Sequence, residues 1–132
     1  MSSTHLVLHD PEGHLDAELP LDRELHKALV KAVLGWAGNS GLPPADLQQI
    51  ALLLTGAAHA VAGDVRRAAD LLPEDHAARA LADVVLEEAD RRLSAPAEGT
   101  VGCAQNRARL VRALYERLDR LASVAPQTAT AP

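Results

Sequence analysis

The sequence predicts an all-α protein, a four-helix bundle with a long central second helix and flexible N- and C-terminal tails. Apolar residues make up 48% of the 132 residues, yet there is no Phe, one Trp and one Tyr. Alanine, which is abundant here, has the highest helix propensity. Breaks containing Pro or Gly divide residues 21–123 into four segments with helical periodicity. We therefore expect one helical domain over residues 21–123, a loosely docked tail over residues 1–20 and a disordered tail over residues 124–132.

The first 20 residues show no helical periodicity and contain Pro11, Gly13 and Pro20, which interrupt helices. A short alternation over residues 5–8 is compatible with an extended strip that lies on the bundle. A mobile or loosely docked tail is the other interpretation, and terminal segments of this kind favour it.

The first helix is expected over residues 21–36. Asp22 and Glu24 lie near its N-terminus, where the helix dipole favours negative charge. The residues that share its apolar face are Leu25, Leu29, Ala32, Val33 and Trp36. Residues 38–41, Gly-Asn-Ser-Gly, end this helix because they tolerate a left-handed backbone. His26, one turn after Asp22, is expected to form a surface pair with it.

The second helix is expected over residues 43–72. Pro43 and Pro44 fit its first turn, where a missing N–H costs nothing. One apolar stripe comprises Leu47, Ile50, Ala51, Leu54, Ala58, Val61, Val65 and Leu72. A second stripe on the opposite side comprises Leu52, Leu53, Gly56, His59, Ala60 and Gly63. A helix that is apolar on two sides must be covered on two sides.

This second stripe predicts a homodimer. The other three helices are short of residues to cover both sides of the long helix, and soluble monomers rarely expose a continuous apolar strip. Gly56 and Gly63 would let two backbones approach closely in a two-fold contact. The alternative is that the N-terminal strip, or the first helix with Trp36, covers this face within one chain.

The third helix is expected over residues 73–93, because Pro73 breaks the second helix and Glu74 and Asp75 suit a new first turn. Its expected core face comprises Ala77, Leu81, Val84, Val85 and Ala89. The fourth helix is expected to begin at Thr100 or Val101 and to end near Ser123. Its apolar stripe comprises Ala104, Ala108, Val111, Leu114, Tyr115, Leu118 and Leu121.

His59 is the candidate centre of a ligand-binding groove. Gly56 and Gly63 share its helix face, and Leu52 continues that face by one further turn. A histidine among glycine and alanine could bind a small molecule or carry a proton. The other interpretation is a hydrogen-bonded histidine at a helix or subunit contact. No second metal ligand lies at helical spacing on this face, so we expect no metal and no cofactor.

The fourth helix carries the second candidate site, a strip that would bind an acidic partner. Its residues are Arg109, Arg112, Arg117 and Arg120. The alternative is the solvated face of an amphipathic helix, on which these side chains pair with Glu116. Cys103, near the start of this helix, is either a small packed residue or a thiol influenced by the helix dipole.

Charge and cysteine content limit the classes of partner and the compartment. The formal net charge of −5 argues against nucleic acid, which requires a clustered basic face. A single cysteine suits a reducing compartment. There is no signal-peptide pattern and no run of eighteen apolar residues. We expect a cytoplasmic protein without a membrane partner.

Two stretches carry a family resemblance: LLLTGAAHAVAGDVRRAADLLPEDHAARALADVVLEEADRRL and NRARLVRALYERLDRL. They resemble small, uncharacterised actinobacterial helical proteins described only as natural-product biosynthesis proteins. The resemblance covers about half of the chain. It implies a helical fold and a biosynthetic setting, and it transfers no catalytic residue.

Together these observations predict a non-enzymatic accessory or regulatory protein that binds a protein of the same pathway. The alternative is a small-molecule-binding bundle or minor enzyme that uses the groove at Gly56, His59 and Gly63. A shape-complementary second face on the long helix would favour the first function. A closed cavity with polar groups converging on His59 would favour the second.

Overall fold

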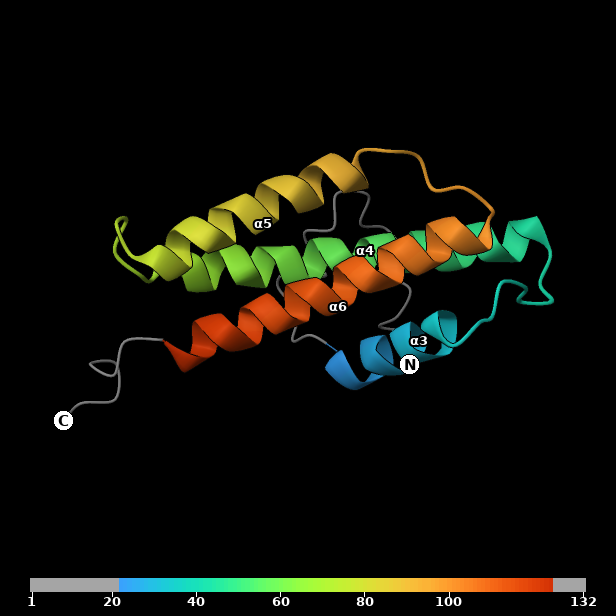
Figure 1. Cartoon of the computed structure of the whole chain (residues 1–132), viewed down its shortest axis with the longest axis horizontal. Coiled ribbons are helices and arrows are strands. Elements are labelled where there is room, and N and C mark those ends of the chain that lie inside the picture. The colour runs from blue at the N-terminus through green and yellow to red at the C-terminus, as the bar shows by residue number, and fades with distance from the viewer. Residues whose placement is uncertain (1–21, 125–132) are drawn as a thin grey trace, which may run out of the picture.

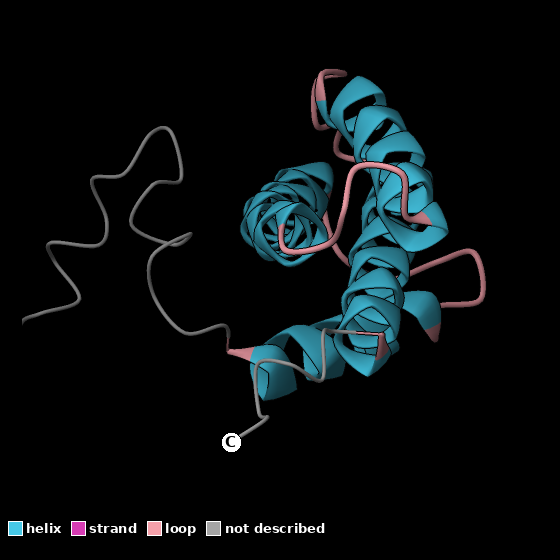
Figure 2. Cartoon of the chain, turned by 90° about the vertical axis from the view of Figure 1, so that its left-hand side faces the viewer, coloured by secondary structure: helices cyan, strands magenta, loops and turns pink. Residues whose placement is uncertain are grey.

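The computed structural model describes residues 22–124, which form four helices (Figure 1). They are α3 (Arg23–Leu34), α4 (Pro44–Asp70), α5 (Ala77–Leu93) and α6 (Val101–Ser123). Every regular element in this part of the chain is a helix (Figure 2). The all-α class and the long second helix are therefore confirmed. The two predicted tails lie outside the described residues, apart from Val124, which caps the C-terminus of α6.

Helices α4 and α6 form the central pair of the bundle. They make the most extensive contact between any two elements, whereas α3 packs mainly on α6 and α5 mainly on α4. Figure 1 shows α3 and α5 on opposite sides of this pair. Since α3 and α5 each contact chiefly one partner, the bundle leaves a groove open beside each of them.

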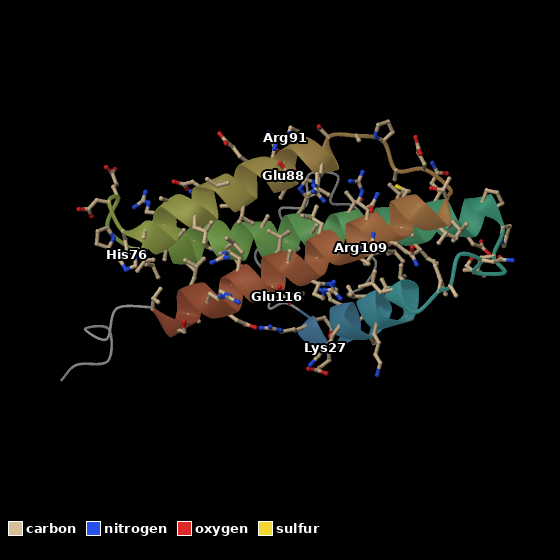
Figure 3. The ribbon with its side chains drawn as sticks, in the orientation of Figure 1. Lys27, His76, Glu88, Arg91, Arg109 and Glu116 are labelled. Carbon is tan, nitrogen blue, oxygen red and sulfur yellow. The ribbon has the colours of Figure 1, made fainter. Side chains whose placement is uncertain are left out.

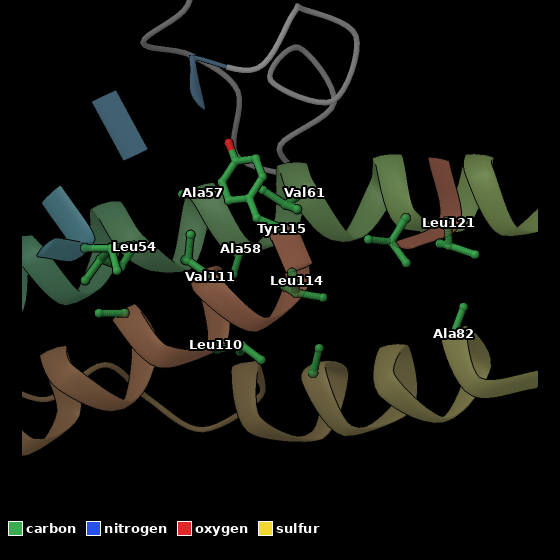
Figure 4. Packing of buried hydrophobic residues seen from close by; sticks show 14 of the residues in the cluster. Leu54, Ala57, Ala58, Val61, Ala82, Leu110, Val111, Leu114, Tyr115 and Leu121 are labelled. Carbon is green, nitrogen blue, oxygen red and sulfur yellow. The ribbon is translucent and has the colours of Figure 1, made fainter. Parts of the chain in front are cut away.

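Small side chains allow α4 and α6 to approach closely. Ala51 and Ala58 of α4 and Ala104 and Ala108 of α6 are fully buried. The larger residues around them in the same cluster are Leu54, Val61, Val65, Val111, Leu114 and Leu121, most of which Figure 4 shows. The first stripe predicted for the second helix and the stripe predicted for the fourth are confirmed, with Ile50 and Leu118 only partly buried.

Helix boundaries follow local chemistry. The side chains of Asp22 and Thr100 accept hydrogen bonds from backbone N–H groups in the first turns of α3 and α6. Pro44 occupies the first position of α4. Helix α4 ends at Asp70, and α5 folds back along it, so the predicted break at Pro73 is confirmed (Figure 1).

The predicted start of α5 is wrong, and its predicted core face is wrong in part. The helix begins at Ala77 rather than at residue 73, because His76 is its N-cap and accepts a hydrogen bond from the Ala78 N–H. Of the predicted core face, Ala89 is buried and Val85 packs partly against the core, whereas Leu81 is 44% and Val84 61% exposed. Ala82 is buried, and Leu86 and Leu93 also pack against the core, so the packed face lies to one side of the predicted one.

The predicted face of α3 is also partly wrong. Val30 and Val33 are its buried residues, and Leu29, Leu34 and Trp36 pack partly against the core. Leu25, expected in the core, is exposed. Because α3 packs against α6 and barely touches α4, only a narrow stripe of its surface is covered.

Long polar side chains bind the free carbonyls at the C-terminal ends of three helices. Arg79 donates to the Leu72 carbonyl after α4, and Gln105 donates to the Val33 and Trp36 carbonyls at the end of α3. Arg107 donates to the carbonyls of Arg92 and Ala95 at the end of α5. The last turn of a helix leaves carbonyls without intrahelical partners, so these bonds fix where each chain segment goes next.

The loop over residues 94–100 is anchored to the start of α4. A Cβ built on Gly99 would lie 2.4 Å from the Pro44 carbonyl oxygen, so only glycine fits this approach. The Gln48 amide donates to the Ala97 carbonyl at 3.1 Å. This segment, which reads as an ordinary breaker in the sequence, therefore joins three helices.

The Arg107→Met variant should lower the free energy of unfolding by about 2 kcal/mol, because the carbonyls of Arg92 and Ala95 each lose a charged donor. Arg107 is only 6% exposed, and methionine keeps much of its packing volume. Urea unfolding followed by circular dichroism measures the change. Arg109→Met, at an exposed position one half-turn away, is the matched control and should change stability by less than about 0.5 kcal/mol. Equal effects of the two variants would show that the carbonyl bonds are unimportant.

Candidate functional site

A groove between α3 and α6 has the most apolar lining of the three hollows described below, all within residues 22–124. Its volume is about 500 Å³, within the range of ligand pockets in proteins. The residues that line it are Arg23, His26, Lys27, Val30, Lys31, Leu34, Gly35, Arg112, Tyr115 and Glu116. We call it the α3/α6 groove.

The floor of the α3/α6 groove is apolar. Val30 and Tyr115 are buried, and Leu34 is half-buried. The Tyr115 hydroxyl and His26 Nδ1 lie 2.6 Å apart and share a hydrogen bond that joins the two helices. His26 is thus half-buried and bonded across the groove, which corrects the expectation of a surface pair with Asp22. Burial raises the pKa of Tyr115, and the nearby Arg23 opposes that shift.

Arg23 closes one end of the groove. Its guanidinium carbon lies 4.6 Å from the centroid of the Tyr115 ring, and its two terminal nitrogens donate to the Asp119 carboxylate at 2.8 and 2.6 Å. The hydrogen bonds from Arg23 lower the pKa of Asp119, and the same bonds raise the pKa of Arg23. Arg23 therefore fixes the N-terminus of α3 on α6.

The rim of the groove is cationic. Lys27 and Lys31 lie one turn apart on α3, and Arg112 lies on the facing helix. These three side chains are exposed and form no ion pair with another described residue. Glu116 is the one acidic lining residue, and Figure 3 shows it on α6 with Lys27 on α3.

An apolar floor beneath several cations suits an amphipathic anion. Apolar groups of a ligand would cover Val30, Leu34 and Tyr115, while carboxylates would lie near the lysines. Glu116 on the opposite rim would repel a second carboxylate there, which gives the groove a preferred direction of binding.

The predicted ligand residues around His59 are only partly brought together. His59 and Gly63 line a shallow groove of about 230 Å³ between α4 and α5, together with Ala62, Arg66, Leu86, Ala89, Asp90 and Leu93. Gly56 and Leu52 do not line it: Leu52 is 50% exposed, and no described atom lies within 4 Å of a Cβ built on Gly56. This groove is smaller than most small-molecule sites.

The four arginines of the predicted docking strip have different environments. Arg112 lines the α3/α6 groove, whereas Arg109 is exposed and donates to Asn106. Arg120 is exposed, and Arg117 is half-buried, with no hydrogen-bond partner for its Nε among residues 22–124. Of the four arginines, only Arg112 lies in the α3/α6 groove, together with Lys27 and Lys31 of α3. These two residues were not predicted from the sequence, although they are the only lysines in the chain and lie one helical turn apart.

A second hollow, of about 760 Å³, lies where the loop before α6 meets that helix. Cys103 lines it and accepts a hydrogen bond from the Glu98 N–H at 3.3 Å. Arg107, which also lines it, is engaged with backbone carbonyls. Within residues 22–124, no three His, Cys, Asp or Glu side chains converge to hold a metal ion. No helix in these residues is long and apolar enough to cross a bilayer.

The Asp119→Asn variant should be less stable than the wild type by at most about 1 kcal/mol, because the ion pair is exposed to solvent. In the folded wild type the pKa of Asp119 lies below the ordinary 3.8. The stabilisation by the ion pair is therefore complete above that value and is lost as the pH falls through the folded-state pKa. The difference between wild type and variant should therefore be constant above about pH 5 and shrink below it. Urea unfolding across this pH range measures it.

Asp90→Asn is the control for this experiment, because Asp90 is exposed and forms no ion pair with a described residue. Its difference from wild type should be small and show no comparable change with pH. A difference for Asp119→Asn that stays constant from about pH 5 down to the lowest pH at which the protein is still folded would contradict the assigned role of the Arg23 bridge.

Comparison with known proteins places the chain in a family but gives it no activity. No curated protein and no solved structure matches it. The sequence model of one family of unknown function matches residues 16–123, which span all four helices. The chain belongs to this family, DUF6415.

Proposed function

We propose that the protein is a non-enzymatic accessory or regulatory module that binds an acidic, amphipathic segment of another protein. The α3/α6 groove is the observation that carries this proposal. It combines an apolar floor of Val30, Leu34 and Tyr115 with the cations Lys27, Lys31 and Arg112. Helix α3 is 12 residues long, so the groove extends over about 18 Å, the length of three helical turns.

The chemistry of the groove defines the partner. Apolar residues at helical or alternating spacing would lie on the floor, and Asp or Glu side chains beside them would approach Lys27 and Lys31. Long-range attraction to these cations would raise the association rate and make it sensitive to salt. The resemblance to actinobacterial natural-product biosynthesis proteins suggests that this partner belongs to such a pathway in the cytoplasm.

The α4 face supports a homodimer as part of the same proposal. Leu52 is 50% and Leu53 55% exposed, and the space above Gly56 is open to described atoms. Such neighbouring apolar side chains on a long helix favour a two-fold contact. Ala60 is buried and Gly63 borders α5, so the proposed contact is centred on Leu52, Leu53 and Gly56.

Small-molecule binding is the second candidate function. The size of the α3/α6 groove and its apolar floor favour it, and the ligand would be an amphiphile with one anionic group. The groove at His59 and Gly63 supports this alternative less well, since its volume is about 230 Å³. An anionic amphiphile that binds the isolated protein tightly, and competes with every protein partner, would favour this second function.

Charge reversal tests the partner-binding proposal. Lys27→Glu/Lys31→Glu should lose a protein that the wild type captures from an extract of the native host, with binding at least about tenfold weaker. The matched control is Arg91→Glu/Arg109→Glu, which changes the charge equally at exposed residues outside the groove (Figure 3). Affinity measurements on the identified protein, at low and high salt, provide the readout. Equal binding by both variants would refute the groove as the binding site.

Gly56→Leu tests the homodimer. In a monomer the added side chain meets open space, and replacing a helical glycine should raise stability by about 0.5–1 kcal/mol. In a dimer centred on this residue, leucine would separate the two helices and weaken association. Light scattering at tens of micromolar, combined with thermal unfolding, distinguishes these outcomes. A wild-type mass of one chain would end the dimer proposal.

A further inference from the structure

The charge of this chain is divided unevenly between its first 21 residues and the rest. Residues 1–21 contain four acidic residues, Asp10, Glu12, Asp16 and Glu18, and neither Lys nor Arg. They account for −4 of the formal net charge of −5. The remaining residues are nearly balanced in charge, and their exposed lysines both line the α3/α6 groove.

We propose that residues 5–19 of this chain dock in the α3/α6 groove and occupy it until a partner displaces them. The docking is argued from the complementarity between the segment and the groove. The regulation of partner binding by the segment rests on the function proposed above. The N-terminal segment would then be an internal competitor that resembles the partner in chemistry.

Charge complementarity is the first argument. Lys27, Lys31 and Arg112 present positive charge with no ion pair among the described residues. A carboxylate close to such a cation is attracted to it, although the net gain of each exposed pair is small after desolvation and side-chain ordering are subtracted, so several pairs are needed. Asp16 and Glu18 are the acidic residues nearest in sequence to α3, and they would reach Lys27 and Lys31 after one reversal of the chain.

Apolar complementarity is the second argument. Leu15, Ala17 and Leu19 alternate with Asp16 and Glu18, and residues 6–8 form a second apolar run, Leu-Val-Leu. An extended chain places alternate side chains on one face, so Leu15, Ala17 and Leu19 could cover the floor while the two carboxylates point to the rim. The floor offers Val30, Leu34 and Tyr115 as their contacts. A purely acidic tail would lack these apolar contacts with the floor.

The tether is the third argument. The segment joins α3 directly at Asp22, and the groove runs along α3 from Arg23 to Gly35. An extended chain of about six residues spans the 18 Å length of this helix, so residues 5–19 suffice to turn back and follow it. A short linker gives an effective concentration in the millimolar range. Weak intrinsic affinity is therefore enough to keep the groove occupied.

Occupation by the segment would set the partner's apparent affinity. A partner binds only the fraction of molecules whose groove is free, so its apparent Kd is raised in inverse proportion to that fraction. Substitutions that weaken the segment's contacts should thus strengthen partner binding, whereas charge reversal in the groove should weaken it. The opposite effects on partner affinity distinguish an inhibitory segment from the binding groove.

A spin label on the segment tests the docking. The full-length Cys103→Ser/Gly13→Cys chain carries one nitroxide at position 13, and amide signals are recorded with the label oxidised and reduced. We expect the strongest broadening on residues 26–35 of α3 and 112–116 of α6. Lys27→Glu/Lys31→Glu in the same background should abolish it, whereas Arg91→Glu/Arg109→Glu should leave it intact. Adding Asp16→Lys/Glu18→Lys to the groove reversal should restore it.

Broadening centred instead on Leu52, Leu53 and Gly56, or no localised broadening, would overturn the docking. The partner experiment reads the regulatory half separately: Asp16→Lys/Glu18→Lys alone should raise partner affinity about five- to tenfold. If the label marks the groove but partner binding ignores groove charge reversal, the proposed function fails and the docking holds. If groove reversal abolishes partner binding but the label marks no site, the proposed function holds and this inference fails.

Discussion

The close contact between α4 and α6 is the constraint on which the rest of the fold depends. Alanines at the contact let the two helices approach, and the leucines and valines around them then bury most of their surface. Alanine itself buries little area, so the stability of this pair depends on its length of contact rather than on large side chains. Helices α3 and α5 each pack on one member of this pair, and the two grooves described above lie along their edges.

The predictions from sequence succeeded for the stripe of α6 that contains Leu114 and for the longer of the two stripes on α4, which contains Leu54. These two stripes have the most large aliphatic residues at helical spacing, and they form the contact between the two central helices. The predictions failed in part on α5, where apolar residues occupy more than one face: Leu81 and Val84 are exposed, whereas Leu86 and Leu93 pack against the core. Hydrophobicity alone cannot rank such faces, because the side chains on them are of similar size.

The α3/α6 groove could not be predicted from the sequence for a different reason. Its two walls are separated by about eighty residues, and the pairing of α3 with α6 rather than with α4 follows from tertiary packing. Arg112 was identified as a candidate, but its partners Lys27 and Lys31 were not. His26 shows the same limit: its sequence neighbour Asp22 suggested a local pair, whereas its described bond is to Tyr115 across the groove. Spacing along one helix predicts local neighbours well and distant ones not at all.

The attachment of α3 has a thermodynamic consequence. This helix contacts essentially one neighbour, and polar bonds hold both its ends to α6, through Arg23 and Asp119 at the start and through Gln105 at the finish. An element with so few contacts is the natural first unit of sub-global unfolding, able to detach while the central pair stays intact. A ligand in the groove contacts both α3, which can detach, and α6, which belongs to the stable central pair. Ligand binding and the local folding of α3 are consequently linked equilibria. Occupancy of the groove would therefore slow the amide hydrogen exchange of α3 while that of the central pair stays unchanged.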